Sequence, residues 1–591
     1  MIQRTTECVP HIRLNSRMTV ISQCYYSFFL VLIFFLIGNR VTAQDIEQLA
    51  NQKKIAVSGG IDARMIFYDA NGIQPRYLPF NYLISGSPIV SIYGIQIPVY
   101  FSLSRQQNSF TQPFNQFGLS PRYKSLKVHA GYRNLQYSQF TLAGHTFLGG
   151  GFDFTPGKLR ISAMYGRFNK ATVLDTLQGV YIENFSYRRT GYAARVGYGT
   201  QQSFFDITLL HAKDHGSSER TTNTEWLDSL KITPAENLVT GYQTRLSIIK
   251  NKLSIESDGA FSLYTTDRRI GSIEDSTLAD KVKPFEKFTN VNYSSELYAA
   301  FSASLLYKIK MMSWRLTYRY VEPNYKSMGA YFLNNDLENI TINPSLFLGQ
   351  GKVRFTGSLG LQRDNLQDLK RATSRRVIGA ANLSAELLPT LGVDLSYTNF
   401  SNTQRARTVR FADSLRVAQT TQNFSITPRF IKSSALHSHS VIVSLNYNQF
   451  EELNTQRTLE GSGDDIITQT YFATYQHGFL ASRSSLFVTA SYAKLGNDLI
   501  KDQNSGFTLG GTKSLLSNKL VLSLSSGFLF SHRNGERGKI LNESLQARYG
   551  IDRHHNLNFM LMYLGNYPDE PSELLRRFSE LRVELGYGFN F

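Results

Sequence analysis

Cysteine is almost absent from this 591-residue sequence. Cys8 and Cys24 are its two cysteines, and both lie in the first 24 residues. A chain that loses this N-terminal segment keeps no thiol, so disulfide bonds, thiol catalysis and cysteine-ligated metals are excluded from the remainder. The lack of cysteine is compatible with passage through an oxidising compartment outside the cytoplasm.

The N-terminal segment has the pattern of a secretory signal peptide. Residues 25–38 form an apolar run that follows a basic residue and precedes NRVTAQ, with small residues before a cleavage site between Ala43 and Gln44. We therefore predict that residues 1–43 are a signal peptide and that residues 44–591 are the mature protein. A retained anchor helix is the alternative, although the run is shorter than the roughly 20 residues that a spanning helix needs.

Catalytic and cofactor motifs are also missing. The sequence has no HExxH zinc motif, no GxSxG nucleophile elbow and no phosphate-binding GxxxxGK[ST] loop. His437 and His439, like His554 and His555, are paired closely enough for a metal site, but no cluster of carboxylates surrounds them, and we interpret them as polar turn residues. We expect no enzyme activity, no metal and no cofactor. A hydrolase that pairs His145 with a serine is an alternative that no sequence motif supports.

Tryptophan is scarce, and the other aromatic residues are abundant. The chain has 2 Trp against 33 Tyr and 40 Phe, and its formal net charge is +18. Tyrosine and phenylalanine are typical of the girdles where strands cross lipid headgroups. A basic chain could bind nucleic acid, but export argues against this class of partner. Anionic lipopolysaccharide, or a lumen that favours anionic solutes, fits an exported chain better.

Long apolar segments are missing after the leader, and a strict alternation of apolar and polar residues takes their place. It is clearest at residues 580–591, and it recurs at residues 159–166, 297–308, 353–362 and 440–448. A period of two predicts strands with one apolar and one polar face. In the last segment the apolar face consists of Leu581, Val583, Leu585, Tyr587, Phe589 and Phe591.

Strand length and loop length separate two all-β folds. The alternating segments are about 10 to 14 residues long, longer than most soluble strands and long enough to cross a bilayer. Short connections such as residues 155–158 and 250–252 alternate with long polar ones such as residues 213–233. A sandwich does not explain the many small hydrophilic residues opposite the apolar face. We predict a large antiparallel transmembrane β-barrel of about 24 strands, within 22 to 26, with short periplasmic turns and long extracellular loops.

The N-terminal third of the mature chain is less regular. Residues 55–67, 95–103 and 126–132 show the strand pattern, but residues 105–122 form a long polar stretch where a short turn is expected. We expect this stretch either to fold into the lumen as a small plug or to contain a strand that the count has missed. A barrel of this size leaves a lumen that is open or occupied by such a segment.

Arginines on the polar face of strands are the main functional hint. Arg160, Arg195, Arg354 and Arg582 are expected to project into the lumen. One interpretation is that they pair with luminal acids such as Glu584 and Asp394 and fix the barrel shape. The other is a ring of positive charge that selects anionic solutes.

The chain resembles outer-membrane barrels of the Bacteroidota in its VTAQ cleavage context and its terminal GYGFNF. Residues 114–168 resemble a block in uncharacterised barrels of that phylum. The resemblance implies that the barrel-assembly machinery reads the final strand, so that Tyr587, Phe589 and Phe591 form an insertion signal. TonB-dependent transporters of the phylum have a large plug domain before the barrel, whereas strands begin near Ile55 here. The resemblance is therefore to a porin-like barrel without that domain.

Two functions follow from this architecture. The first is a porin-like or substrate-selective channel of the cell outer membrane that favours anionic solutes. The second is a non-conducting structural or accessory barrel that works with an envelope partner in secretion, lipopolysaccharide handling or envelope assembly. Lipid, lipopolysaccharide and the assembly machinery are the expected partners, and nucleic acid is not. Fold alone does not choose between these functions.

Overall fold

The computed structural model describes most of the chain after residue 54. The described ranges are 55–93, 95–105, 115–171, 186–216, 232–250, 252–273, 286–330, 333–370, 372–406, 417–452, 465–497, 501–572 and 575–591. The predicted signal peptide, including Ala43 and Gln44, lies outside these ranges. Within them, no helix is long and apolar enough to cross a membrane.

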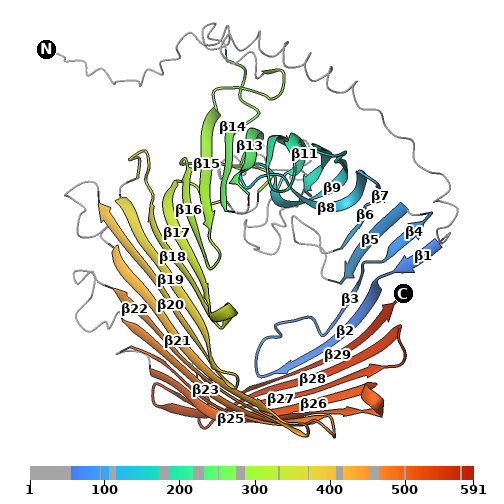
Figure 1. Cartoon of the computed structure of the whole chain (residues 1–591), viewed down its shortest axis with the longest axis vertical. Helices are drawn as coiled ribbons and strands as arrows, with labels where there is room; N and C mark the ends of the chain where they lie inside the picture. The colour runs from blue at the N-terminus through green and yellow to red at the C-terminus, as the bar shows by residue number, and fades with distance from the viewer. Residues whose placement is uncertain are drawn as a thin grey trace. The chain divides into compact units, whose positions relative to one another are not determined.

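All labelled strand segments belong to one closed antiparallel sheet. β2 (Gly60–Asn71) pairs with β29 (Phe578–Asn590) as well as with its neighbour β3 (Phe80–Gly86). This pairing brings the first and last strands of the ring side by side, as Figure 1 shows in blue and red. Closure leaves no open sheet edge, which is the condition for a sheet to cross lipid.

The described chain forms 26 strands, because three strands of the ring are each interrupted once. The interrupted strands are β1 (Ile55–Ser58) with β2, β3 with β4 (Ile89–Ile92), and β6 (Gln116–Leu119) with β7 (Arg122–Tyr123). The first break lies at Gly59, whose φ is +103° and whose added Cβ would lie 2.6 Å from the Ser87 carbonyl oxygen. Only glycine fits here, because the break between β1 and β2 lies directly against the break between β3 and β4.

The remaining strands follow in sequence around the ring. In the first half they are β5 (Ile95–Ser104), β8 (Leu126–Gln136), β9 (Ala143–Phe154), β10 (Leu159–Asn169), β11 (Arg188–Gly199), β12 (Phe204–His215), β13 (Glu236–Ile249), β14 (Leu253–Thr265), β15 (Ser295–Lys308) and β16 (Met312–Val321). Each pairs with the next one from β8 to β16.

The second half of the ring includes the longest strands, such as β19 (Ala372–Leu388) and β21 (Val417–Ser433). Its strands are β17 (Leu337–Leu348), β18 (Val353–Arg363), β19, β20 (Leu391–Ala406), β21, β22 (His437–Glu452), β23 (Ile466–Phe479), β24 (Ser484–Gly496), β25 (Lys501–Leu515), β26 (Leu520–Arg533), β27 (Glu536–Gly550), β28 (His555–Pro568) and β29. Two single-turn 3₁₀ segments, η4 (Gly349–Gly351) and η6 (Leu516–Asn518), form two of the connections.

The count of 26 corrects the expected 24, and the difference comes from the N-terminal third. The two strands that the alternation did not predict are β3 with β4 and β6 with β7. Pro88 and Pro121 interrupt these strands, and proline removes a backbone donor, so the sequence pattern there is broken as well. Of the stretch 105–122, residues 106–114 lie outside the described residues. Its described part joins the wall through pairing of β6 with β5 and β8.

The apolar face of the strands is the exposed one. In β29, Leu581, Leu585 and Tyr587 are 39%, 45% and 40% exposed, whereas Glu580 and Glu584 on the opposite face are 7% and 9% exposed. A soluble sandwich buries its aliphatic face, so this arrangement is the reverse of a soluble core. It is the pattern of a barrel whose outer face contacts lipid. The protein has an outer-membrane β-barrel-like fold.

The two ends of the barrel differ in how the strands are joined. At one end β13 stops at Ile249 and β14 starts at Leu253, and we call this the short-turn end. At the other end β14 stops at Thr265 and β15 starts at Ser295, and we call this the loop end. The strand ends that flank the long polar connections of the sequence therefore lie at one end of the described barrel.

Candidate functional site

The inner face of the barrel is polar and exposed along much of the second half of the ring. Strands β20 to β23 line a hollow of about 210 Å³ with short hydroxyl and amide side chains. Asn423 and Asn448 lie on this face and hydrogen-bond to each other, and both belong to the exposed wall of the lumen. Such a wall presents water with groups that can exchange hydrogen bonds with a solute.

Two connections from the loop end fold against the inner face on the other side of the ring. We call them inner loop 1, residues 137–142 between β8 and β9, and inner loop 2, the described residues 322–330 and 333–336 between β16 and β17. In inner loop 1, Ser138 donates from Oγ to Asp258 of β14 at 2.6 Å, and the Gln139 N–H donates to the same carboxylate at 3.3 Å. Inner loop 1 is thus fixed to the wall by a carboxylate that is 7% exposed.

Inner loop 2 is fixed to the same part of the wall by its backbone. Ser262 of β14 donates from Oγ to the Lys326 carbonyl at 2.6 Å, and the Met328 N–H donates to the Asn237 side chain at 3.0 Å. Asn237 and Ser262 also bond each other at 2.7 Å. Because both side chains are fully buried, each bond satisfies a group that would otherwise lack a partner.

The two inner loops also bind each other. The Tyr325 hydroxyl donates to the Phe140 carbonyl at 2.8 Å, and Ser327 donates from Oγ to the Thr141 carbonyl at 2.5 Å. The Ala143 N–H donates to the Gly329 carbonyl at 2.9 Å. Gly329 lies so close that an added Cβ would be 2.7 Å from both Leu210 and the Thr141 carbonyl. These contacts make one structural unit of the two loops.

A hydrophobic core inside the barrel lies beneath the inner loops. Phe140, Leu142 and Tyr325 pack onto aliphatic side chains of the inner wall, and all are at most 1% exposed. Burial of each large side chain contributes about 1.5–3 kcal/mol, so the loops are held by packing as well as by hydrogen bonds. The wall contributes Met164, Phe168, Ala193, Leu210, Val239, Ala260, Ala300 and Val321. The inner loops therefore narrow the lumen on this side as a packed structure.

The alternation of apolar and polar residues does not predict the inner loops, although a local signal for them exists in the sequence. In β12, Leu209 and Leu210 are adjacent, and in β13 Leu238 and Val239 are adjacent, so both faces of these strands are apolar there. The outer apolar face contacts lipid, so the inner apolar face must be covered by another part of the protein. Runs that are apolar on both faces near one end of a barrel strand predict such a cover.

Two of the arginines predicted to face the lumen are paired with acids on the wall. The Arg160 guanidinium lies 3.1 Å from Asp206, which is fully buried, and 4.1 Å from the centroid of the Phe204 ring. Arg195 lies 3.9 Å from Asp153 and donates to Ser162 at 2.8 Å. These contacts satisfy charges that would be costly if left alone in a buried wall.

The other two predicted arginines have different environments. Arg582 pairs with Glu584 at the seam where β29 meets β2, and Glu584 also lies 3.9 Å from Arg64. Arg354 donates to the Gly351 carbonyl at 3.2 Å, and Asp394 pairs with Arg429 instead. The anticipated pairing of luminal arginines with acids is seen for Arg160, Arg195 and Arg582, but not for Arg354.

A chain of hydrogen bonds connects serine, histidine and aspartate on the inner wall. His129 Nδ1 lies 2.7 Å from Ser120 Oγ, and His129 Nε2 lies 2.9 Å from Asp153. Ser120 and His129 are each 2% exposed, and Asp153 is shared with Ser162 and Arg195. Because both side chains are buried, we interpret the hydrogen-bonded chain as part of the wall. His145, considered above for a hydrolase, is 3% exposed and packs on Phe168.

The residues expected to form an insertion signal lie on the outer face at the short-turn end. Tyr587 is 40% exposed and binds His555 Nδ1 at 2.6 Å. Phe589 contacts the Phe591 ring with centroids 4.8 Å apart, and the Phe591 N–H donates to the Gly59 carbonyl at 2.9 Å. The terminal aromatics thus stand beside the first strand, and their role in insertion stays a prediction.

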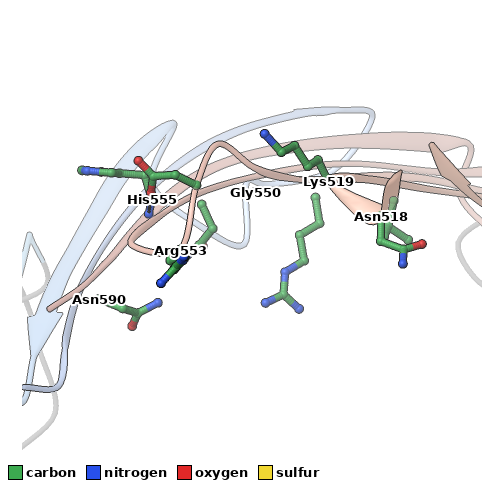
Figure 2. A pocket seen from close by; sticks show the side chains of 10 residues that line it. Asn518, Lys519, Gly550, Arg553, His555 and Asn590 are labelled. Atoms are coloured by element: carbon green, nitrogen blue, oxygen red, sulfur yellow. Dashed lines mark hydrogen bonds between the residues drawn. The ribbon is translucent and has the colours of Figure 1, made fainter. Parts of the chain in front are cut away.

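A basic pocket lies at the short-turn end of the lumen. It has a volume of about 340 Å³ and is bounded by the turn that ends at Lys519, the turn between β27 and β28, and the end of β29. Figure 2 shows Arg553 and Asn590 side by side, while Lys519 extends away from them. Arg548 from the inner face of β27 is a further lining residue. Among the lining residues, Asp552 is the one acid.

Histidines at this end contact one another and neighbouring aromatic side chains. Within the described ranges no group of three or more histidine, cysteine, aspartate or glutamate side chains is arranged to hold a metal ion. His437 and His477 contact each other, with His437 Nδ1 at 3.1 Å from His477 Nε2, and His439 bonds Tyr475 at 2.9 Å. They belong to the aromatic surface of β22 and β23.

Comparison with known proteins assigns this chain to no family. No known protein family matches the sequence, and no curated protein is similar to it. Among solved structures, the translocation pore of the P pilus usher PapC is 9% identical with a TM-score of 0.37, and the match covers 91% of this chain and 100% of that one. The FrpB iron transporter of Neisseria meningitidis is 10% identical with a TM-score of 0.36, covering 93% and 83%. OccAB2 of Acinetobacter baumannii is 8% identical with a TM-score of 0.28, covering 61% and 92%.

Proposed function

We propose that this protein is a passive channel of the cell outer membrane that admits small polar solutes. The supporting observation is the contrast between the two sides of the inner wall. The described inner face of β20 to β23 is polar and exposed, while the packed inner loops reduce the lumen on the side of β10 to β16. A wide polar lumen with a fixed constriction allows diffusion and limits the size of the solute.

The proposal includes an orientation in the membrane. The short-turn end faces the periplasm and the loop end faces outward, as in barrels whose periplasmic turns are short. The signal peptide directs export, and the assembly machinery and outer-membrane lipid, including lipopolysaccharide, are the partners of insertion. No nucleic acid is involved. We propose no enzymatic role, because Ser120 and His129 of the hydrogen-bonded serine–histidine–aspartate chain are buried.

Single-channel conductance of the refolded protein in a planar bilayer tests this function. We expect steady conductance from the wild type and a larger conductance from the double variant Phe140→Ala/Tyr325→Ala, because these rings hold the inner loops to the wall. Leu486→Ala, which shortens an outward side chain that is 60% exposed, is the matched control and should conduct like the wild type. Silence of both the wild type and the double variant would contradict a channel.

The second candidate is a non-conducting accessory barrel that works with an envelope partner. It is favoured by the same inner loops, because a packed cover inside a barrel can also close it. A silent wild type that conducts when the inner loops are released by Phe140→Ala/Tyr325→Ala supports this candidate. The partner would then be one that displaces inner loop 1 or inner loop 2.

A further inference from the structure

The basic pocket at the short-turn end differs from the rest of the charged lumen. Several arginines of the described inner wall are neutralised by acids, as in the pairs of Arg160 with Asp206 and of Arg429 with Asp394, whereas Arg354 bonds a turn carbonyl instead. Within the described residues, neither Arg548 nor Arg553 takes part in an ion pair. Two guanidinium groups therefore line one pocket with their charge uncompensated.

The acid in the pocket does not compensate them. Asp552 accepts hydrogen bonds through Oδ1 from the N–H groups of His554 and His555, each at 2.8 Å. These bonds hold the pKa of Asp552 below its usual value and fix its carboxylate on the turn. With Lys519 at the edge, the lining residues have three permanent positive charges and one negative charge.

The three segments that form the pocket are tied together by their backbones. The Asn590 N–H donates to the His554 carbonyl at 2.7 Å, and His554 Nδ1 donates to the Asn590 carbonyl at 2.7 Å. The Gly550 N–H donates to the Lys519 carbonyl at 2.7 Å. A pocket built in this way holds its donors in place before a ligand arrives, which lowers the entropic cost of binding.

The turn at the pocket edge has a strained backbone. Leu516, Ser517 and Asn518 have φ values of +51°, +54° and +72°, and none of them is glycine. The equivalent turn at Gly349–Gly351 adopts the same left-handed form with two glycines. Left-handed geometry is unfavourable for non-glycine residues because Cβ approaches the following carbonyl oxygen too closely. Such strain is concentrated at functional positions, and here it presents Asn518 to the pocket.

We propose that this pocket binds an oxyanion, the phosphate or carboxylate group of a small solute, between Arg548 and Arg553. Guanidinium groups present paired donors that match the oxygens of both groups. The amides of Asn518, Asn556 and Asn590 line the pocket and can donate to further oxygens. Because Arg548 lies on the inner face, the ligand arrives through the lumen or its mouth rather than from lipid. The proposal rests on the proposed channel and gives its solute class.

Lys519 provides a matched control for this site. It lines the same pocket and has the same unit charge as either arginine, but its side chain extends away from Arg553 and Asn590 (Figure 2). Removal of its charge changes the electric field of the mouth and leaves the two guanidinium donors intact. A specific site predicts that Arg548→Gln/Arg553→Gln weakens binding much more than Lys519→Gln does. A diffuse positive field predicts similar losses of affinity for Lys519→Gln and for the double variant.

Titration calorimetry of the refolded full chain in neutral detergent tests the site without requiring conduction. Pyrophosphate and succinate are the probes for the phosphate and carboxylate classes. We expect at least one of them to bind the wild type, and Arg548→Gln/Arg553→Gln to weaken that binding about tenfold or more, because each lost charge-assisted bond is worth about that factor. Lys519→Gln should change the affinity by less than about threefold, since it removes only a screened charge.

Several outcomes overturn the proposal. The proposal is overturned if neither probe binds the wild type. It is also overturned if Lys519→Gln weakens binding as much as the double variant does, because a diffuse positive field then explains the effect. Should the double variant fail to fold, Arg548→Lys and Arg553→Lys replace it, with a loss of affinity expected because lysine lacks the paired donors. A protein that conducts but binds neither probe refutes this site alone. A protein that binds the probe and is silent in bilayers refutes the channel alone.

Discussion

At the scale of single residues, burial decides what each luminal charge does. Arg160 and Arg354 have similar sequence contexts, each alternating with apolar residues in a strand. Asp206 opposite Arg160 is fully buried, whereas Arg354 binds a turn carbonyl. An arginine beside a buried carboxylate contributes to stability, and one beside a carbonyl remains available to the lumen.

We predict that Arg160→Gln destabilises the barrel more than Arg354→Gln does. Removal of the partner leaves the buried charge of Asp206 uncompensated, which costs about 3–5 kcal/mol, whereas Arg354→Gln should cost less than about 1 kcal/mol. Urea unfolding in detergent, followed by the loss of heat-modifiable migration, measures the difference. Arg160→Gln/Asp206→Asn should regain most of the lost stability, and no recovery would contradict the assigned pair.

We predict that Gly59→Ala is more harmful than Gly535→Ala. Both glycines have positive φ, at +103° and +95°, so alanine is strained at either position. At Gly59 the new Cβ would also lie 2.6 Å from the Ser87 carbonyl, while nothing lies within 4 Å at Gly535. We expect an additional loss of about 1–3 kcal/mol at Gly59, measured by the same unfolding assay. Equal losses would show that the two strand breaks can move apart.

At the scale of elements, the inner loops show how a connection becomes part of the lumen wall. Inner loop 2 is fixed at its far end by Asp336, whose carboxylate accepts from the Leu366 N–H at 2.9 Å and pairs with Lys370. Burial alone would raise the pKa of Asp336, but the bonds from Lys370 and from backbone N–H groups outweigh it and lower that pKa. The connection between β18 and β19 thereby fixes the connection between β16 and β17.

We predict that inner loop 2 loosens in acid. Because the folded pKa of Asp336 lies below its unfolded value of about 3.9, its contribution is fully present above that pH and is lost as pH falls through the folded pKa. Asp336→Asn should therefore increase hydrogen exchange in inner loop 2 at pH 7. The difference in hydrogen exchange between the variant and the wild type should shrink when both proteins are equilibrated and compared below about pH 4. A pH-independent difference would contradict the assigned role of the carboxylate.

At the scale of the whole molecule, closure is the property that all other features require. β2 and β29 pair over their full length, from Gly60 with Asn590 to Asn71 with Ser579. On the inner side of the seam Tyr68 donates to Glu580 and Arg582 pairs with Glu584. The chain therefore cannot complete its wall until its last strand is in place.

We predict that Phe591→Ser impairs assembly in cells more than refolding in detergent. Phe591 follows β29, and its backbone N–H bond to Gly59 does not need the ring, so closure should persist in the variant. The insertion signal implied by the resemblance does need the ring. The ratio of membrane-inserted protein in cells to heat-modifiable protein after refolding measures the difference. A parallel loss in both assays would assign Phe591 a structural role instead.

The sequence by itself determined the faces of the strands, because a period of two fixes which side chains share a face and an apolar outer face needs lipid. It therefore predicted the closed all-β barrel, while the luminal role of Arg160, Arg195, Arg354 and Arg582 stays a prediction. The tertiary structure decided the rest. Prolines interrupt two wall strands, the inner loops depend on contacts across more than 180 positions, such as Tyr325 with Phe140, and the basic pocket joins three segments that the pairing of β26 to β29 brings to one end of the sheet. Such contacts leave no local periodicity in the chain, and only the folded ring brings them together.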